Sequence, residues 1–105
     1  MRVYWTWEAR SRLQEIEDYI AHDSPQNARQ VARRLVVRTR DLATLPRVGR
    51  VVPEYPGAGL HELLERPFRL IYRVTAERVE IMTVMHYRQL LPSDWRELLN
   101  PPRPS

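Results

Sequence analysis

Side chains that could act together in chemistry gather in the last third of the chain. Arg69 and Arg73 stand in "PFRLIYRV", and "MHYR" ends in His86, Tyr87 and Arg88. An imidazole titrates near neutral pH and can act as a general acid. An arginine guanidinium stays protonated and binds phosphate or carboxylate oxygens through a fixed fork of donors. The cluster is therefore a candidate site for catalysis on an anionic substrate, or for contact with an acidic partner.

The strands that carry these residues determine whether they can meet. Phe68 to Val74 alternates, which places Arg69, Ile71 and Arg73 on the face opposite the apolar residues. We expect Arg69 and Arg73 to point outward, away from the helices. His86 and Tyr87 are adjacent, so they point to opposite faces unless the strand ends or bulges there.

The remaining elements indicate an α+β fold. Thr6 can cap a first helix, and Ser24 with Pro25 begins a second helix that we expect to reach Leu45. Antiparallel pairing of the three C-terminal strands then leaves this helical hairpin to cover one face of the sheet. The expected elements are a strand at 3–7, helices at 8–21 and 25–45, a loop at 46–59, strands at 60–66, 68–74 and 78–87, and a short helix at 93–99. We expect a single domain at 1–100 and a disordered tail at 101–105.

Composition limits the possible functions. The chain has 105 residues and a formal net charge of +4, and all 17 basic residues are arginines. This charge favours an acidic partner, either nucleic acid or an acidic protein segment. Cysteine is absent and the three histidines are scattered, so we expect neither a metal nor a cofactor. No apolar run could cross a membrane and no signal peptide begins the chain, so we expect a cytoplasmic protein without a membrane partner.

Four stretches in this order resemble the RelE/ParE superfamily of toxins from bacterial type II toxin–antitoxin systems. They are "WTWEARSRLQEIEDYIAHDSPQNA", "LPRVGRVVPE", "HELLERPFRLIYRV" and "VEIMTVMHYR". The resemblance runs from about Val3 to about Leu91 and implies a growth-inhibiting toxin held silent by an antitoxin. His61 departs from the pattern, because these sequences commonly have arginine there.

The resemblance leaves two mechanisms open. RelE-like members cleave mRNA inside the ribosome, and cleavage needs a base, cations for the phosphate and an acid. RelE itself uses lysines, which this chain lacks. A resemblance to YoeB-like toxins implies a catalytic set of Glu, Arg, His and Tyr. In this chain Glu54 or Glu65, Arg69 or Arg73, and the pair His86 and Tyr87 could supply it. ParE-like members inhibit DNA gyrase and are not known nucleases, and a histidine at this strand end is then structural.

We favour the ParE-like alternative because the "DYIAHDSPQNA" junction and the long second helix resemble that branch. The partner expected in either case is an antitoxin segment that folds on binding, in a toxin–antitoxin hetero-oligomer. We expect it to contact Arg69, Ile71, Arg73, His86 and Arg88. A third alternative is a basic nucleic-acid-binding module without toxicity. The arginines of the second helix fit a solvated face, or a surface that meets gyrase or nucleic acid.

Overall fold

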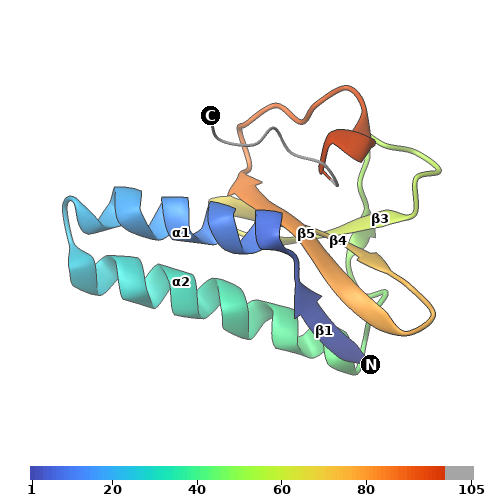
Figure 1. Ribbon diagram of the computed structural model, residues 1–105, viewed down its shortest axis with the longest axis horizontal. Coiled ribbons are helices and arrows are strands. Elements are labelled where there is room, and N and C mark those ends of the chain that lie inside the picture. Colours follow the sequence, from blue (N-terminus) through green and yellow to red (C-terminus); the bar gives the residue numbers. More distant parts are fainter. Residues whose placement is uncertain (99–105) are drawn as a thin grey trace.

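One five-stranded sheet and a helical hairpin make up the computed structural model, which describes residues 1–98 (Figure 1). The predicted disordered tail at 101–105 lies outside the described residues. In chain order the elements are β1 (Arg2–Trp5), α1 (Trp7–Ala21), α2 (Pro25–Arg40), η1 (Asp41–Ala43), β2 (Arg50–Val51), β3 (Leu60–Glu65), β4 (Phe68–Val74), β5 (Arg78–His86) and η2 (Trp95–Leu98). The predicted α+β class and element order are confirmed. Within residues 1–98 no helix has the length and apolar character that crossing a membrane requires.

Both helices begin at the predicted caps. The Thr6 hydroxyl accepts a hydrogen bond from the Ala9 amide at 3.1 Å, and the Ser24 hydroxyl accepts one from the Asn27 amide at 3.1 Å. These bonds satisfy amides that have no carbonyl partner in the first helical turn. The second helix ends earlier than the predicted Leu45. Helix α2 stops at Arg40, and the chain continues as the short 3₁₀ helix η1.

The sheet has the strand order β1-β5-β4-β3-β2. The predicted antiparallel pairing of β3, β4 and β5 is confirmed, with Leu70 opposite both Leu63 and Val84. Two features were not predicted: β1 pairs with β5 in parallel, and the loop at 46–59 contains the short edge strand β2. The helical hairpin and strands β2 to β4 lie between β1 and β5 in the chain, and they supply the long connection that parallel neighbours require.

Apolar residues fill both faces of the sheet. On the helix side, the core contains Leu35, Leu63, Leu70, Tyr72 and Ile81, together with other side chains from α1, α2 and the strands. On the opposite side, a second core contains Val52, Tyr55, Leu60, Ile71, Met82, Met85 and Leu98. The loop after β2 and the segment at η2 therefore cover the face that we expected to be open.

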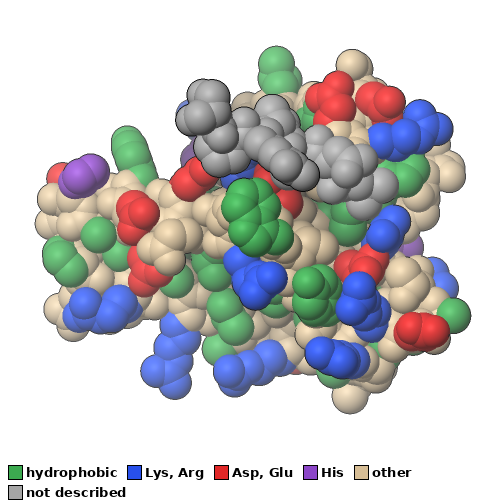
Figure 2. All heavy atoms as spheres, viewed as in Figure 1, with side chains coloured by type: hydrophobic (Ala, Val, Ile, Leu, Met, Phe, Trp, Pro, Cys, Tyr) green, Lys and Arg blue, Asp and Glu red, His purple; other side chains and the backbone are tan. Residues whose placement is uncertain are grey.

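Charge is distributed unevenly over the helical hairpin. Helix α2 contains five arginines and no acidic residue, whereas α1 contains four acidic residues and two arginines. Figure 2 shows positively charged side chains along the lower edge of the view, over α2. The two helices thus present surfaces of opposite net charge to the solvent.

Candidate functional site

The residues His86, Tyr87 and Arg88 meet at the C-terminal end of β5. The strand ends at His86, and the Tyr87 amide turns to donate a hydrogen bond to the Pro67 carbonyl at 2.8 Å. The two neighbouring rings then stack with centroids 5.0 Å apart, and Arg88 Nε donates to the Tyr87 hydroxyl at 3.0 Å. Because the strand ends here, the adjacent side chains of His86 and Tyr87 are not forced to opposite faces of the sheet and can share one site.

Local hydrogen bonds and packing determine the orientation of His86. Its Nδ1 accepts a hydrogen bond from the Arg88 amide at 3.1 Å, and its own amide donates to Gln89 Oε1 at 2.8 Å. The ring also packs edge-on against Phe68, with centroids 6.2 Å apart. Because Nδ1 acts as an acceptor, the neutral ring carries its proton on Nε2. These contacts suit a residue that closes a strand end, and they leave Nε2 as the nitrogen for chemistry.

Arg69 lies in a partly buried ion network on the face of the sheet away from the helices. Its side chain is 7% exposed; it donates through Nε to Glu62 at 2.6 Å and through both terminal nitrogens to Glu54 at 2.7 and 3.0 Å. Glu62 accepts a further bond from Arg50 at 2.6 Å. The bonds to Glu54 raise the pKa of Arg69 despite its burial, and they lower the pKa of Glu54. Arg69 is thus fully engaged in joining β3, β4 and the loop after β2.

Arg73 lies nearer the other end of β4 and forms an ion pair across to β5. Its Nε donates to Glu80 at 2.5 Å, and Arg78 donates to the second oxygen of the same carboxylate at 2.8 Å. Burial would raise the pKa of Glu80, but the hydrogen bonds from the two arginines outweigh it and lower the pKa. Both arginine side chains are partly exposed, at 37% and 40%.

The expectation that Arg69 and Ile71 form an open contact surface is wrong. Ile71 is 0% exposed because it belongs to the second core, and Arg69 is 5% exposed and bonded to Glu54 and Glu62. Arg73 and Arg88 remain accessible. Strand alternation predicted the face of these side chains correctly. It gave no information about the chain segments that fold back over that face.

The two glutamates considered as general bases lie apart from His86. Glu54 lies in the loop after β2, where Arg69 donates to it at 2.7 Å. Glu65 is on the helix side, where it pairs with Arg34 at 3.2 Å and Arg38 at 3.5 Å. In the sheet register Phe68 lies between Glu65 and His86. Glu54 with Arg69, Glu65 and Arg73 are therefore engaged in clusters away from the strand end. His86, Tyr87 and Arg88 come together at the strand end itself.

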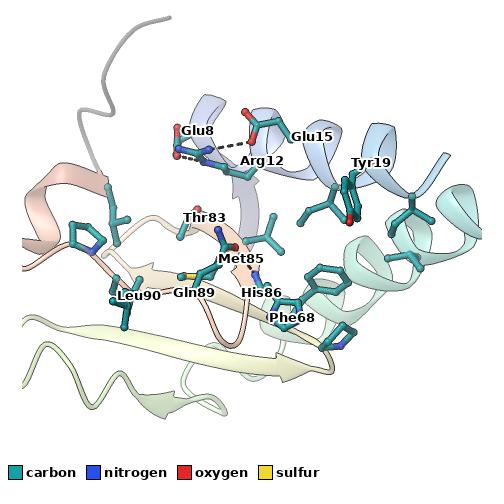
Figure 3. Close-up of a pocket in the computed structure, with 18 of the residues that line it drawn as sticks. Glu8, Arg12, Glu15, Tyr19, Phe68, Thr83, Met85, His86, Gln89 and Leu90 are labelled. Atoms are coloured by element: carbon teal, nitrogen blue, oxygen red, sulfur yellow. Dashed lines mark hydrogen bonds and ion pairs between the residues drawn. The ribbon is translucent and has the colours of Figure 1, made fainter. Parts of the chain in front are cut away.

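A groove of about 930 Å³ runs beside β5, between α1 and the segment that follows the strand (Figure 3). Its floor is apolar and includes Ile16, Ile20, Val31, Phe68 and Val84, and His86 lies in its wall. The groove exists because β1 stops opposite Ile81, so on that side nothing among the described strands pairs with the rest of β5. Figure 3 shows Glu8, Arg12 and Glu15 joined along α1 at one rim.

Sequence reasoning missed this groove. Two of its lining side chains, Tyr19 and Leu90, are 79% and 95% exposed, an unusual degree for large apolar residues. Helical spacing places Tyr19 beside Ile16, three residues earlier, on the side away from Ile20. The apolar face of α1 is therefore broader than one core contact requires. That width was the available signal. No group of three or more His, Asp or Glu side chains within residues 1–98 is arranged to hold a metal ion.

The chain matches a toxin family model and proteins of similar sequence along most of its length. Residues 3–91 match the family model described as the ParE toxin of the type II toxin–antitoxin system parDE. The chain is 38% identical over 95 residues to Y4kP of Sinorhizobium fredii, covering 87% of this chain and 93% of that protein. It is 36% identical over 90 residues to the toxin RelE2 of Caulobacter vibrioides, covering 85% of this chain and 98% of that protein.

Solved structures show the same fold. A structure of the chromosomal ParDE toxin–antitoxin system from P. aeruginosa superposes with a TM-score of 0.70 at 27% identity, covering 82% of this chain and 95% of that one. The toxin–antitoxin complex RelBE2 from Mycobacterium tuberculosis gives a TM-score of 0.55 at 28% identity, covering 81% and 95%. The N-terminal strand, the helical hairpin and the antiparallel strands are features of this shared architecture.

Proposed function

The chain belongs to the ParE toxin family of type II toxin–antitoxin systems, and from this premise we propose that it arrests bacterial growth by inhibiting DNA gyrase without catalysing a reaction itself. One observation carries the proposal: the glutamates and the β4 arginines that a ribonuclease would need are engaged in ion pairs away from His86. Arg69 is buried between two glutamates, and Arg73 is paired with Glu80. A phosphate-clamping arginine must present free donors to the substrate beside the acid, and neither residue does so next to His86.

A direct test combines purified protein with gyrase and plasmid. We expect loss of supercoiling or accumulation of cleaved plasmid, and we expect His86→Ala to act like the wild type. The same variant should still arrest growth when expressed without an antitoxin. An untouched gyrase reaction would refute the proposal, and so would loss of toxicity in a His86→Ala protein whose unfolding curve is unchanged.

Ribosome-dependent mRNA cleavage is the second candidate, because His86, Tyr87 and Arg88 do meet at one site. The stacked rings and the Arg88–Tyr87 hydrogen bond place an imidazole, a phenol and a guanidinium together at the rim of the groove. Such a set could donate a proton and hold a phosphate. Incubation with ribosomes bearing mRNA distinguishes the candidates: cleavage that requires both His86 and Tyr87 would favour the nuclease.

We propose that the antitoxin covers the groove beside β5. The apolar floor suits the apolar face of an amphipathic segment, and the part of β5 beyond Ile81 can pair with an extended chain. One related structure is a toxin–antitoxin complex, which supports a protein partner of this kind. The groove thus takes the place of the antitoxin surface that we expected around Arg69 and Ile71, which other segments of the chain cover.

Two pairs of exposed apolar residues give a matched test. Tyr19→Asp with Leu90→Asp places charge in the groove, and Leu45→Asp with Val48→Asp places the same charge on a distant loop. Side chains at the centre of an interface often contribute more than about 1 kcal/mol each, so we expect at least roughly tenfold weaker antitoxin binding for the groove pair. Calorimetric titration of each variant with the co-expressed antitoxin measures the dissociation constant. Equal binding by both pairs would exclude the groove.

A further inference from the structure

One row of arginines on α2 is used neither by the fold nor by the groove. Helical spacing of 100° per residue places Arg29, Arg33 and Arg40 within an arc of about 40° on the helix surface. All three are exposed, and none forms an ion pair with any part of the chain that the structure describes. We infer that this row is a binding surface for the phosphate backbone of duplex DNA.

The two other arginines of α2 have a structural role, because they form ion pairs within the fold. Arg34 and Arg38 lie on the flank toward β3, where both pair with Glu65. Asp41, the acidic residue that follows the helix, lies 3.7 Å from Arg38 and is directed to that flank. The paired arginines and the acids thus occupy one side of α2, and the row of Arg29, Arg33 and Arg40 is on another.

The geometry of the row fits a regular anionic polymer. A rise of about 1.5 Å per residue puts Arg33 about 6 Å and Arg40 about 16 Å along the helix from Arg29. A duplex strand carries a charge every 3.4 Å or so of its axis, so a straight row of this length passes several phosphates.

The surrounding charge favours the same partner. Helix α2 lacks acidic residues, whereas the acidic residues of α1, Glu15, Glu17 and Asp18 among them, belong to the other helix of the hairpin. A polyanion is therefore attracted to α2 and repelled from α1, which orients the protein on it. Contacts to phosphate carry no sequence information, so we expect binding that is independent of DNA sequence. The inference concerns naked DNA and does not depend on gyrase.

Fluorescence anisotropy with two unrelated 20-base-pair duplexes, titrated with the full chain over a range of salt concentrations, tests the inference. Three phosphate contacts predict a slope of log K against log salt near −2.7, and thus roughly 40-fold weaker binding at 200 mM than at 50 mM salt. The variant Arg29→Gln/Arg33→Gln/Arg40→Gln should lose nearly all of this slope, and each single substitution about 0.9 of it. Glutamine and arginine have similar helix propensities, so α2 should persist.

A control with the same change in net charge makes the result specific. Arg47→Gln/Arg66→Gln/Arg96→Gln removes three exposed arginines that lie outside α2, and we expect it to leave the slope near that of the wild type. Equal losses in both triple variants would overturn the inference, because net charge alone would explain them. A wild-type slope near zero would overturn it as well. Binding of a polyglutamate peptide without binding of either duplex would also overturn the inference, since the partner of the row would then be an acidic protein.

Discussion

Replacing Arg69 with methionine tests whether this residue holds the fold together or serves a site. The guanidinium lies between Glu62, whose side chain is 0% exposed, and Glu54, whose side chain is 43% exposed. Methionine removes the charge and keeps an apolar stem of similar reach. Glu62 is then buried with Arg50 as its remaining cation, and Arg50 is itself 63% exposed.

The expected cost follows from the burial of Glu62. Removing one partner of a buried ion pair costs about 3–5 kcal/mol, and we expect the lower value of about 3 kcal/mol because Arg50 still donates to Glu62. Glu54 adds little, because water can solvate its exposed carboxylate. For a domain of this size, each kcal/mol lowers the melting temperature by roughly 4–8 °C, so Arg69→Met should melt at least about 12 °C lower. Thermal unfolding followed by circular dichroism measures the change.

Two further variants separate this explanation from simple loss of packing. In Arg69→Met/Glu62→Met the buried charge is gone, so the double variant should be more stable than Arg69→Met alone. Arg73→Met should cost less than Arg69→Met, because Glu80 keeps Arg78 and the Arg73 side chain is 37% exposed. The reasoning is refuted if Arg69→Met loses less than about 1 kcal/mol, or if the double variant is no more stable than the single one.

Three other substitutions probe the sheet and its loop. Hydrogen bonding by Arg69 lowers the pKa of Glu54 below its ordinary 4.5, so this carboxylate stabilises the fold above that pH and the stabilisation is lost as the pH falls further; Glu54→Gln should flatten the acid side of a stability–pH curve. Burial, with the charge of Arg47, lowers the pKa of His61 below 6.5, so acidification from that pH destabilises the wild type. His61→Phe should remove this dependence, and His22→Phe at an exposed position should not. Gly49→Ala should lower the melting temperature, because the new Cβ would lie 2.5 Å from the Glu62 carbonyl oxygen and 2.6 Å from the Tyr72 hydroxyl; an unchanged melting temperature would contradict that contact.

Local sequence signals predicted the elements on which the site is built. Thr6 and Ser24 are capping residues because their hydroxyls reach the amides of the next turn, and this geometry depends only on neighbouring residues. Alternation along Phe68 to Val74 likewise placed Leu70 and Tyr72 toward the helices. The same local rule placed Arg69 and Ile71 on the other face, where the structure has them.

Contacts between distant segments decided what each of those faces does. The sequence by itself determined an α+β order, a capped hairpin, an arginine-only positive charge, and His86 at a strand end. Only the tertiary structure decided that Glu54, 15 residues before Arg69 in the chain, pairs with it and that Leu98 helps to cover Ile71. The groove is also tertiary, since it arises where β1 ends beside β5 and α1 begins. Burial and charge pairing depend on which segments meet in space, and a local pattern of residue types does not specify which distant segments will meet.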